Sequence, residues 1–382
     1  MSHKSLLVVM NTDCLISEDG NMFLNRGIVS FFNELSELDI TPSLLMLDSG
    51  KRVSSAEQQV GKVEISQRFQ VFLLKTLKQV SWPLKIWNLI VALCKMVYCV
   101  VKFQHIYIFF PGNISRLAVL VCRLMHKKYG LYVRGDRFSV PESRTAFEHA
   151  DFILTTGRKL ESAIQQGCRS LKRIDEVVPM VSVFAHPDPY HRVCRSSETS
   201  VVRGLFVGRV ERQKGCRELL LAIRRLKEEN HKFLFHFVGS VDPDVAELID
   251  ELDLRDIVIC KGAIADLSLI AAEYARADFF CLSSYSEGFP RVIYEALYYS
   301  LPIITTMVGG IGGLMKDRVN CLEVQVRDVE SLIVALRKMI SHSDIRERYS
   351  CASRDLFVQL SKKFSGRSHA KQISTWLNEE KQ

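Results

Sequence analysis

Short apolar segments that end in glycine recur in the second half of this chain, and their repetition constrains the fold more than any other feature. Four of them are Leu205 to Gly208, Phe235 to Gly239, Val258 to Gly262 and Pro302 to Gly309. Polar loops and helix-like segments separate them, which is the pattern of parallel strands joined by helices. Open sheets of this kind bind ligands beyond the carboxyl ends of their strands. The sequence therefore predicts an α/β fold with a binding site among these glycine turns.

A fifth apolar segment, Asp278 to Leu282, leads into a polar turn that carries two glutamates eight residues apart, Glu287 and Glu295. Pro290 lies between them, and its fixed φ suits the first position of a helix. The free amides and positive dipole of a helix start favour a bound phosphate. Each carboxylate can accept hydrogen bonds from two sugar hydroxyls. This turn therefore indicates a site for a nucleotide sugar.

The loop after Leu205 to Gly208 adds two cations, Arg209 and Lys214, ahead of a helix-like segment from Glu218 to Glu229. A diphosphate at the start of that helix would collect both positive charges.

In order and spacing, these segments resemble the retaining glycosyltransferases of family 4, whose E-x7-E motif corresponds to Glu287 and Glu295. The resemblance covers roughly residues 203 to 325. It implies the α/β GT-B fold, in which two facing Rossmann-like domains hold an active-site cleft between them. It also implies a hexosyl- or N-acetylhexosaminyl-type transferase that moves a sugar, with retention, from a nucleotide diphosphate-sugar such as a UDP-sugar. The acceptor would be a hydroxyl, which we expect on a lipid-linked saccharide of cell-surface polysaccharide synthesis.

The resemblance also assigns roles to residues of the donor site. Arg209 and Lys214 would stabilise the leaving diphosphate, Glu287 would contact the sugar, and Glu295 would hold the ribose hydroxyls. The remaining donor-binding candidates are Gly208, Gly239, Gly262, Gly288, Phe289, Pro290 and Arg291. No cofactor and no metal is expected, since the nucleotide sugar is a substrate. The Asp242-Pro243-Asp244 triplet matches a metal-binding D-x-D pattern, but helix capping accounts for it better.

The acceptor side is expected in the first half of the chain, where the resemblance is looser. Gly20 is either a residue of the site or an ordinary turn glycine. Arg134 stands where many relatives have a histidine, and it would suit an anionic acceptor or the developing diphosphate. Asp136 could orient a hydroxyl or cap the following turn.

At 382 residues the chain exceeds one typical core, so two domains are expected. The predicted parts are an acceptor-side domain (1–183), a linker (184–200), a nucleotide-sugar domain (201–345) and a helical tail that crosses back to the first domain (346–382). Predicted strands of the first domain are Ser5 to Met10, Ser43 to Leu47, Lys62 to Ile65, His105 to Phe110, Tyr129 to Val133 and Asp151 to Thr155. Predicted helices are Asn25 to Leu38, Arg68 to Gln79, Leu84 to Phe103, Ser115 to Lys127 and Thr156 to Gln166.

Basic residues concentrate in the first half: residues 51–134 hold fourteen Lys or Arg against Glu57 and Glu64, and residues 65–134 hold no acidic residue. Lys85, Asn88, Lys95 and Lys102 share one side of the predicted helix. That helix is either buried with a solvated edge or lies at an anionic membrane surface. The basic stretch could otherwise bind a soluble polyanionic acceptor. Binding of nucleic acid is a further possibility for such a stretch, but no nucleic-acid motif supports it.

The expected location is the cytoplasm, with peripheral attachment to the inner face of the membrane. No signal peptide is recognised, the eleven cysteines are scattered singly, and the apolar run Ile86 to Val101 is too short to cross a bilayer. Two other functions remain open: a sugar-nucleotide epimerase on the same fold, and a non-catalytic protein that binds nucleotide sugars.

Overall fold

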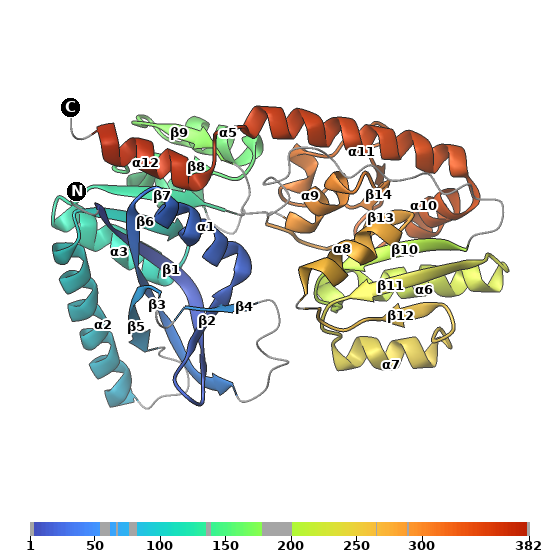
Figure 1. The fold of residues 1–382 in the computed structure, drawn as a ribbon, viewed down its shortest axis with the longest axis horizontal. Helices are drawn as coiled ribbons and strands as arrows, with labels where there is room; N and C mark the ends of the chain where they lie inside the picture. Colours follow the sequence, from blue (N-terminus) through green and yellow to red (C-terminus); the bar gives the residue numbers. More distant parts are fainter. Residues whose placement is uncertain are drawn as a thin grey trace. The chain divides into compact units, whose positions relative to one another are not determined.

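The computed structural model describes residues 4–53, 62–65, 68–75, 82–134, 139–177, 201–264, 266–288 and 290–379 (Figure 1). The chain divides into two compact units. The first contains Met1–Met180 together with Gly366–Gln382, and the second contains Val181–Ser365.

The first unit is built on a sheet whose parallel strands follow the order β5-β3-β1-β6-β7-β8-β9. Strand β2 pairs antiparallel with β1, and β4 pairs antiparallel with β2. The strands are β1 (Lys4–Ser17), β2 (Met22–Asn25), β3 (Ile40–Val53), β4 (Lys62–Glu64), β5 (Gln70–Lys75), β6 (His105–Phe110), β7 (Tyr129–Val133), β8 (Phe152–Thr155) and β9 (Ile174–Glu176). The helices are α1 (Arg26–Glu37), α2 (Trp82–Lys102), α3 (Asn113–Leu124), α4 (Val140–Glu148), α5 (Arg158–Gly167) and α12 (His369–Glu379).

Alternation along β1 divides the core of this unit between the two faces of the sheet. Leu6 and Val8 pack with residues of α1 and α12, whereas Leu7 and Val9 pack with residues of α2 and α3. Successive side chains of a strand point to opposite faces, so one continuous apolar run supplies both layers, as buried parallel strands require.

The second unit is a sheet of parallel strands in the order β12-β11-β10-β13-β14-β15. The strands are β10 (Val202–Val207), β11 (Phe233–Val238), β12 (Val258–Cys260), β13 (Phe279–Leu282), β14 (Ile303–Thr305) and β15 (Leu322–Glu323). The helices are α6 (Cys216–Glu228), α7 (Pro243–Glu251), α8 (Leu267–Arg276), α9 (Arg291–Tyr298), α10 (Val329–Ser341) and α11 (Ser343–Phe364), with short 3-10 turns η3 (Arg212–Lys214) and η4 (Ile311–Gly313). The order reverses between β10 and β13, and such reversal points are where doubly wound sheets bind ligands.

The predicted helix from Arg68 to Gln79 is wrong, because residues 70–75 form strand β5. This strand pairs in parallel with β3, with Leu45 opposite Phe72. A short apolar run such as Val71 to Leu74 suits both a buried strand and a helix, and periodicity alone does not separate them. Pairing with β3 decides in favour of the strand.

Helix α2 differs from its prediction in its length and in how little of it is buried. It is 21 residues long and contains an 18-residue window with a mean hydropathy of 1.8, so its length and composition are sufficient to cross a membrane, and the expectation that the segment is too short is wrong. Length and composition do not separate a span from a domain helix. Only Met96, Cys99 and Val100 of α2 are buried, in the core of the first unit. The description as a buried helix with a solvated edge therefore fits only its last turns.

The carboxyl-terminal part of the chain is shared between the units. Helix α11 belongs to the second unit, and the residues from Gly366 onward belong to the first. In α12, Ile373, Trp376 and Leu377 are buried against the face of the sheet that α1 covers.

Candidate functional site

The loops after β10 and β13, on either side of the reversal point, are joined by hydrogen bonds. Ser283 Oγ donates to the carbonyl of Gly215 at 3.1 Å, and the backbone N–H of Tyr285 donates to the carbonyl of Gln213 at 2.9 Å. Gly215 has a φ of 71°, and a side chain there would collide with the carbonyl oxygen of Ser283. Glycine is therefore needed at position 215 both for its conformation and for the close approach of the two loops.

The contact between these loops centres on the predicted residues Lys214 and Glu287. The Lys214 Nζ lies 2.7 Å from Glu287 Oε1, and Ser284 Oγ donates to the same oxygen at 2.6 Å. Glu287 is buried, with 9% of its side chain exposed, and Lys214 is 22% exposed. Thr306 Oγ1 in turn donates to the carbonyl of Ser284 at 2.7 Å. A cation and a carboxylate are thus held in fixed positions at the edge of the sheet.

The glycine turn after β14 supports the same loop from the other side. Gly309 has a φ of 55°, and a side chain there would collide with the carbonyl oxygen of Glu287. The N–H of Gly310 donates to the carbonyl of Gly288 at 3.1 Å. The backbone around Glu287 is therefore positioned by two segments that are far from each other in sequence, the loop after β10 and the turn after β14.

Glu295 lies on the second turn of α9, as predicted, and has a partner that the sequence did not indicate. The Tyr274 hydroxyl of α8 donates to Glu295 Oε2 at 2.7 Å. Burial raises the pKa of Glu295, and the Tyr274 hydrogen bond and the charge of Arg291 only partly oppose that shift. Tyr274 itself is fully buried and stacks on Tyr299, with ring centroids 5.2 Å apart. Glu295 is therefore a half-buried carboxyl group with a rigid neighbour.

The other predicted donor-side residues occupy the same edge of the sheet. The N–H of Gly208 donates to Val238 O at 2.9 Å, and the N–H of Gly239 donates to Gly262 O at 2.8 Å, so these glycines line up where β10, β11 and β12 end. Arg209 is 71% exposed, and its guanidinium lies 3.3 Å from Glu211.

The start of α9 differs by one residue from its prediction. Pro290 is the N-cap residue rather than the first helical residue, and Arg291, which is exposed, begins the helix. Phe289 lies outside the described residues.

Tyr285 forms a further link that sequence reasoning missed. Its hydroxyl donates to Glu218 Oε2 in the first turn of α6 at 2.6 Å, and the Arg327 guanidinium lies 4.7 Å from the centre of its ring. Burial and the Glu218 carboxylate raise the pKa of Tyr285 to about 12. The tyrosine stays protonated and fixes the β13 loop to α6.

The predicted acceptor-side residues of the first unit are exposed or lie outside the described residues. Gly20 is exposed, with a φ of 84°, in a turn closed by its N–H and the carbonyl of Ser17 at 3.0 Å. Arg134 is exposed, and its guanidinium lies 5.7 Å from the ring centre of Phe109. Asp136 lies outside the described residues.

Asn11, which the sequence did not single out, organises the sheet edge of the first unit between β1 and α3. Its Oδ1 accepts from the N–H of Ile114 at 2.9 Å, and its Nδ2 donates to Ser115 Oγ at 2.7 Å. The side chain therefore caps α3 from a distant strand. A lone asparagine offered no sequence signal for this role, because its partners lie more than a hundred residues away.

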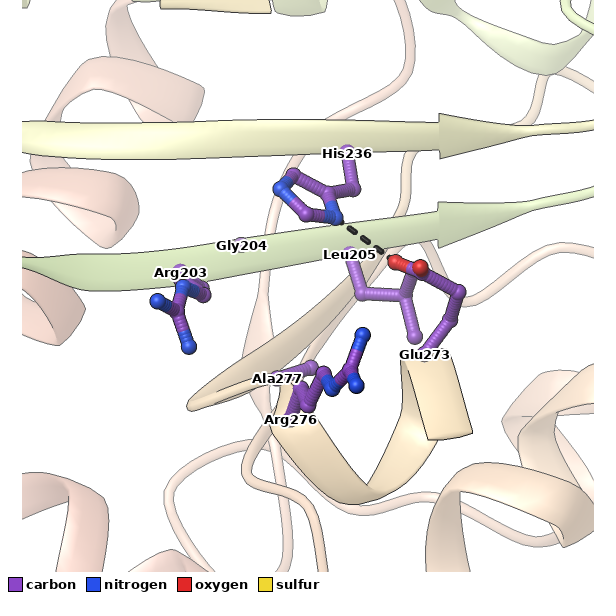
Figure 2. A pocket seen from close by; sticks show the side chains of 7 residues that line it. All are labelled: Arg203, Gly204, Leu205, His236, Glu273, Arg276 and Ala277. Atoms are coloured by element: carbon purple, nitrogen blue, oxygen red, sulfur yellow. Dashed lines mark hydrogen bonds and ion pairs between the residues drawn. The ribbon is translucent and has the colours of Figure 1, made fainter. Parts of the chain in front are cut away.

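A separate hollow in the second unit is lined by Arg203, Gly204, Leu205, His236, Glu273, Arg276 and Ala277. Figure 2 shows the His236 and Glu273 side chains pointing toward one another, with His236 Nδ1 2.6 Å from Glu273 Oε2. Lys261 lies 3.7 Å from the other oxygen of Glu273. These contacts tie α8 to β11, away from the carboxyl ends of the strands, so we assign the pair to the packing of the sheet and not to the donor site.

Within the described ranges, no group of three or more His, Cys, Asp or Glu side chains is placed to hold a metal ion. Asp242 occupies the N-cap position of α7, where the sequence placed it, although its side chain makes no capping hydrogen bond.

Comparison with known proteins shows what the fold and the second unit resemble. Residues 201–356 match the family of glycosyl transferases group 1. An uncharacterized glycosyltransferase of Methanocaldococcus jannaschii is 23% identical over 266 residues, which are 63% of this chain and 64% of that protein. The first relatives found are matched over only 32% to 64% of their own length.

A second relative is named for its substrate. It is the α-1,4-N-acetyl-D-galactosaminyltransferase of Campylobacter jejuni that acts on GalNAc-alpha-(1->4)-GalNAc-alpha-(1->3)-diNAcBac-PP-undecaprenol. It is 27% identical over 147 residues, which are 37% of this chain and 40% of that protein.

The solved structure of the Anabaena protein HepE in complex with UDP and glucose superimposes with a TM-score of 0.66 at 14% identity, covering 99% of both chains. With two α/β units built on parallel sheets, this likeness confirms the predicted GT-B fold class. That the active site lies in a cleft between the two domains stays a prediction.

Proposed function

We propose that this chain is a metal-independent, retaining glycosyltransferase that takes a hexosyl or N-acetylhexosaminyl unit from a nucleotide diphosphate-sugar. The observation that carries the proposal is the Lys214–Glu287 pair, held at 2.7 Å at the reversal point of the second sheet. Support comes from the match of residues 201–356 to group 1 glycosyl transferases and from the likeness in fold to a protein solved with UDP and glucose.

Lys214 is suited to a diphosphate because an ammonium group has three donors. One of them engages Glu287, which leaves two for phosphate oxygens while the ion pair stays intact. Arg209 is exposed and can turn its guanidinium from Glu211 toward the same diphosphate. Both cations would stabilise the negative charge that develops on the leaving group.

Glu295 is suited to the ribose hydroxyls because its carboxylate is short of hydrogen bonds. Tyr274 supplies one donor, and burial raises the pKa. Two ribose hydroxyls donating to the carboxylate would stabilise the charged form that burial disfavours. Glu287, fixed by Lys214 and Ser284, would contact the transferred sugar.

In the proposed reaction, the bond between the anomeric carbon and the diphosphate oxygen breaks. The acceptor hydroxyl oxygen forms the new bond to that carbon on the same face, which retains the configuration. The hydroxyl proton passes to a phosphate oxygen of the departing nucleoside diphosphate. No protein side chain is then needed as the base, in accord with Arg134 standing where relatives carry a histidine.

The acceptor that we propose is a lipid-linked saccharide of cell-surface polysaccharide synthesis, met at the cytoplasmic face of the membrane. The similarity to an enzyme whose named substrate is an undecaprenol-linked saccharide supports this choice. So does the run of residues 65–134, which holds eleven basic and no acidic residues. Anionic lipid attracts such segments.

The test is to screen nucleotide sugars by thermal shift, and then to incubate the preferred donor with lipid-linked acceptors and follow both products by mass spectrometry. A glycosyltransferase increases the mass of the acceptor by one sugar and releases nucleoside diphosphate. An isomerised donor with unchanged acceptor would instead identify an epimerase. Binding without turnover across the acceptor panel would identify a non-catalytic protein.

A further inference from the structure

Exposed apolar side chains gather on one helix of the first unit. Among the described residues, eighteen large apolar side chains are exposed; nine of them belong to α2 and three to the end of α3 or the residue after it. Trp82 is 69% exposed and Trp87 is 63% exposed. Soluble monomers seldom expose large contiguous apolar patches, so such a concentration marks an interaction surface. Figure 1 shows α2 along the outer edge of the first unit.

The outward side of α2 is a continuous apolar row. Trp87, Ile90, Cys94, Tyr98 and Val101 follow one another at spacings of three or four residues, which places them on one face of the helix, and all five are exposed. The opposite side packs into the core only through the last turns of the helix. The first two turns are therefore exposed nearly all round.

The apolar surface continues onto the end of α3. Lys127, just beyond α3, donates from its amine to the carbonyls of Val101 and Phe103 at 3.1 and 3.2 Å, which brings the carboxyl ends of the two helices together. Leu124 and Met125 precede it and are exposed. The two helices thus present one joint surface, which we call the α2–α3 face.

Basic side chains border this face. The only charged residues of α2 are Lys85, Lys95 and Lys102, all exposed. The Lys102 amine lies 5.8 Å from the ring centre of Tyr98, and Lys95 lines the same hollow beside β5 as Trp87. Lys95 donates to the carbonyl of Leu73 at 3.2 Å, and the Lys102 amine lies 5.4 Å from the ring centre of Phe72. The amines therefore lie on the flank next to β5.

We propose that the α2–α3 face inserts into the surface of an anionic lipid bilayer, with α2 lying in the plane of the interface. Apolar side chains with flanking lysines match the acyl chains and the anionic headgroups of one leaflet, and tryptophan favours the boundary between them. Because Met96, Cys99 and Val100 are part of the protein core, α2 lies on the bilayer and does not cross it. This deepens the proposed membrane location, on which it rests, by naming the contact surface, and it is independent of the donor site.

The tryptophans of the chain can report this contact by their fluorescence. Of its three tryptophans, Trp82 and Trp87 are exposed on α2, and Trp376 is buried in α12. Adding vesicles of phosphatidylcholine with phosphatidylglycerol should shift the tryptophan emission of the full-length protein to shorter wavelength. Lipids brominated on the acyl chains should quench that emission. Flotation should show that part of the binding persists at about 1 M salt, where the Debye length is about 3 Å and headgroup attraction is screened.

Two sets of substitutions separate insertion from attraction. Trp87→Ser, Ile90→Ser and Tyr98→Ser together should weaken the salt-resistant binding by at least about tenfold. The matched control, Leu269→Ser, Val319→Ser and Val334→Ser, removes exposed apolar groups of the second unit and should bind like the wild type. Changing Lys85, Lys95 and Lys102 together to Glu should weaken binding at low salt and leave the salt-resistant part.

The proposal is overturned if the emission does not shift, if salt releases all bound protein, or if the serine triple variant binds like the wild type. It is also overturned if light scattering shows a lipid-free dimer that the serine variant dissociates, because the α2–α3 face then contacts a second copy. Binding of UDP or GDP, measured without vesicles, reports the donor site separately. Either proposal can therefore fail while the other holds.

Discussion

Lys214 and Glu287 are 73 residues apart in sequence, yet the amine of one lies 2.7 Å from the carboxylate of the other. The two residues lie in the loops after β10 and β13, on either side of the strand reversal, so the ion pair joins those two loops. Ser284 donates to the same carboxylate oxygen at 2.6 Å, which leaves Glu287 little freedom to turn.

Removing either cation should slow transfer strongly. Lys214→Ala and Arg209→Ala each delete a charged donor aimed at the leaving diphosphate, and such losses commonly cost about 2.7–4 kcal/mol of barrier, or about 10²–10³ in kcat. Steady-state kinetics at saturating donor would measure the effect. Lys232→Ala, an exposed lysine of the same unit, serves as the control. Turnover near that of the wild type in both site variants would rule out the diphosphate assignment.

Ser284→Ala should reduce kcat by about 10–100-fold with little change in the KM for donor, because a hydrogen bond to a charged group is worth about 1.5–3 kcal/mol. The serine does not touch the substrate in this proposal; it fixes Glu287 in place. Ser286→Ala, an exposed serine two residues along the same loop, should behave like the wild type. Equal kinetics for the two variants would contradict a positioning role for Ser284.

The two glutamates should separate binding from transfer. Glu295→Gln removes the carboxylate proposed to hold the ribose and should weaken binding of the free nucleotide itself. Glu287→Gln should leave nucleotide binding largely intact and slow transfer of the sugar. Calorimetric titration with UDP and GDP gives the affinities, and turnover assays give the rates. An unchanged affinity of the Glu295 variant for the preferred nucleotide would refute the ribose assignment.

Glu295 should also leave a signature in the pH dependence of stability. Burial raises its pKa in the folded protein, so the folded state keeps the proton to higher pH than the unfolded state does. The contribution of this group is then full below its unfolded pKa of about 4.3 and is lost as pH rises through the folded pKa. Glu295→Gln cannot titrate, so it should gain stability relative to the wild type between acidic and neutral pH.

Urea unfolding at a series of pH values measures that difference. Glu347→Gln, at an exposed position, is the control. A difference between Glu295→Gln and the wild type that is constant from pH 4 to pH 8 would show that the carboxyl titrates alike in both states.

Gly309→Ala tests how closely the glycine turn after β14 supports the site. The backbone there has a φ of 55°, and the new methyl group would meet the carbonyl oxygen of Glu287. Gly366→Ala is matched to it, with a φ of 73° and open space around the position. The left-handed conformation costs both variants about 1–2 kcal/mol of stability. Gly309→Ala should lose more than that and also lose activity, which thermal melts and turnover would reveal; equal losses and full activity would argue against the contact.

Much of the second unit could be predicted from local sequence, because a glycine follows each of β10, β11, β12 and β14 within a few residues. Position at the sheet edge then follows from parallel topology, which is why Lys214 and Glu287 were assigned to one site. The hydrogen bond of Tyr274 to Glu295 could not be predicted in this way. It depends on how α8 packs beside α9, and no spacing in the sequence encodes that packing.

The first unit was harder to predict for a different reason. A four-residue apolar run at Val71 to Leu74 fits a helix or a strand equally well, and only pairing with β3 decides. Likewise, the apolar length of α2 predicted a helix correctly, while its exposure depends on which neighbours cover it. Asn11 acts on α3 across a hundred residues, so its role becomes visible only once β1 and α3 are adjacent.

The position of α12 bears on the order in which the chain can fold during synthesis. Trp376 packs on Phe152, with ring centroids 4.8 Å apart, and lies beside His105 at 5.2 Å. Domains generally fold as units while the ribosome is still extending the chain, the earliest first. Here the unit that is begun first lacks part of its core until α12 has left the ribosome, whereas Val181–Ser365 is contiguous and complete sooner. One face of the first sheet therefore stays incompletely covered until α12 has been synthesised.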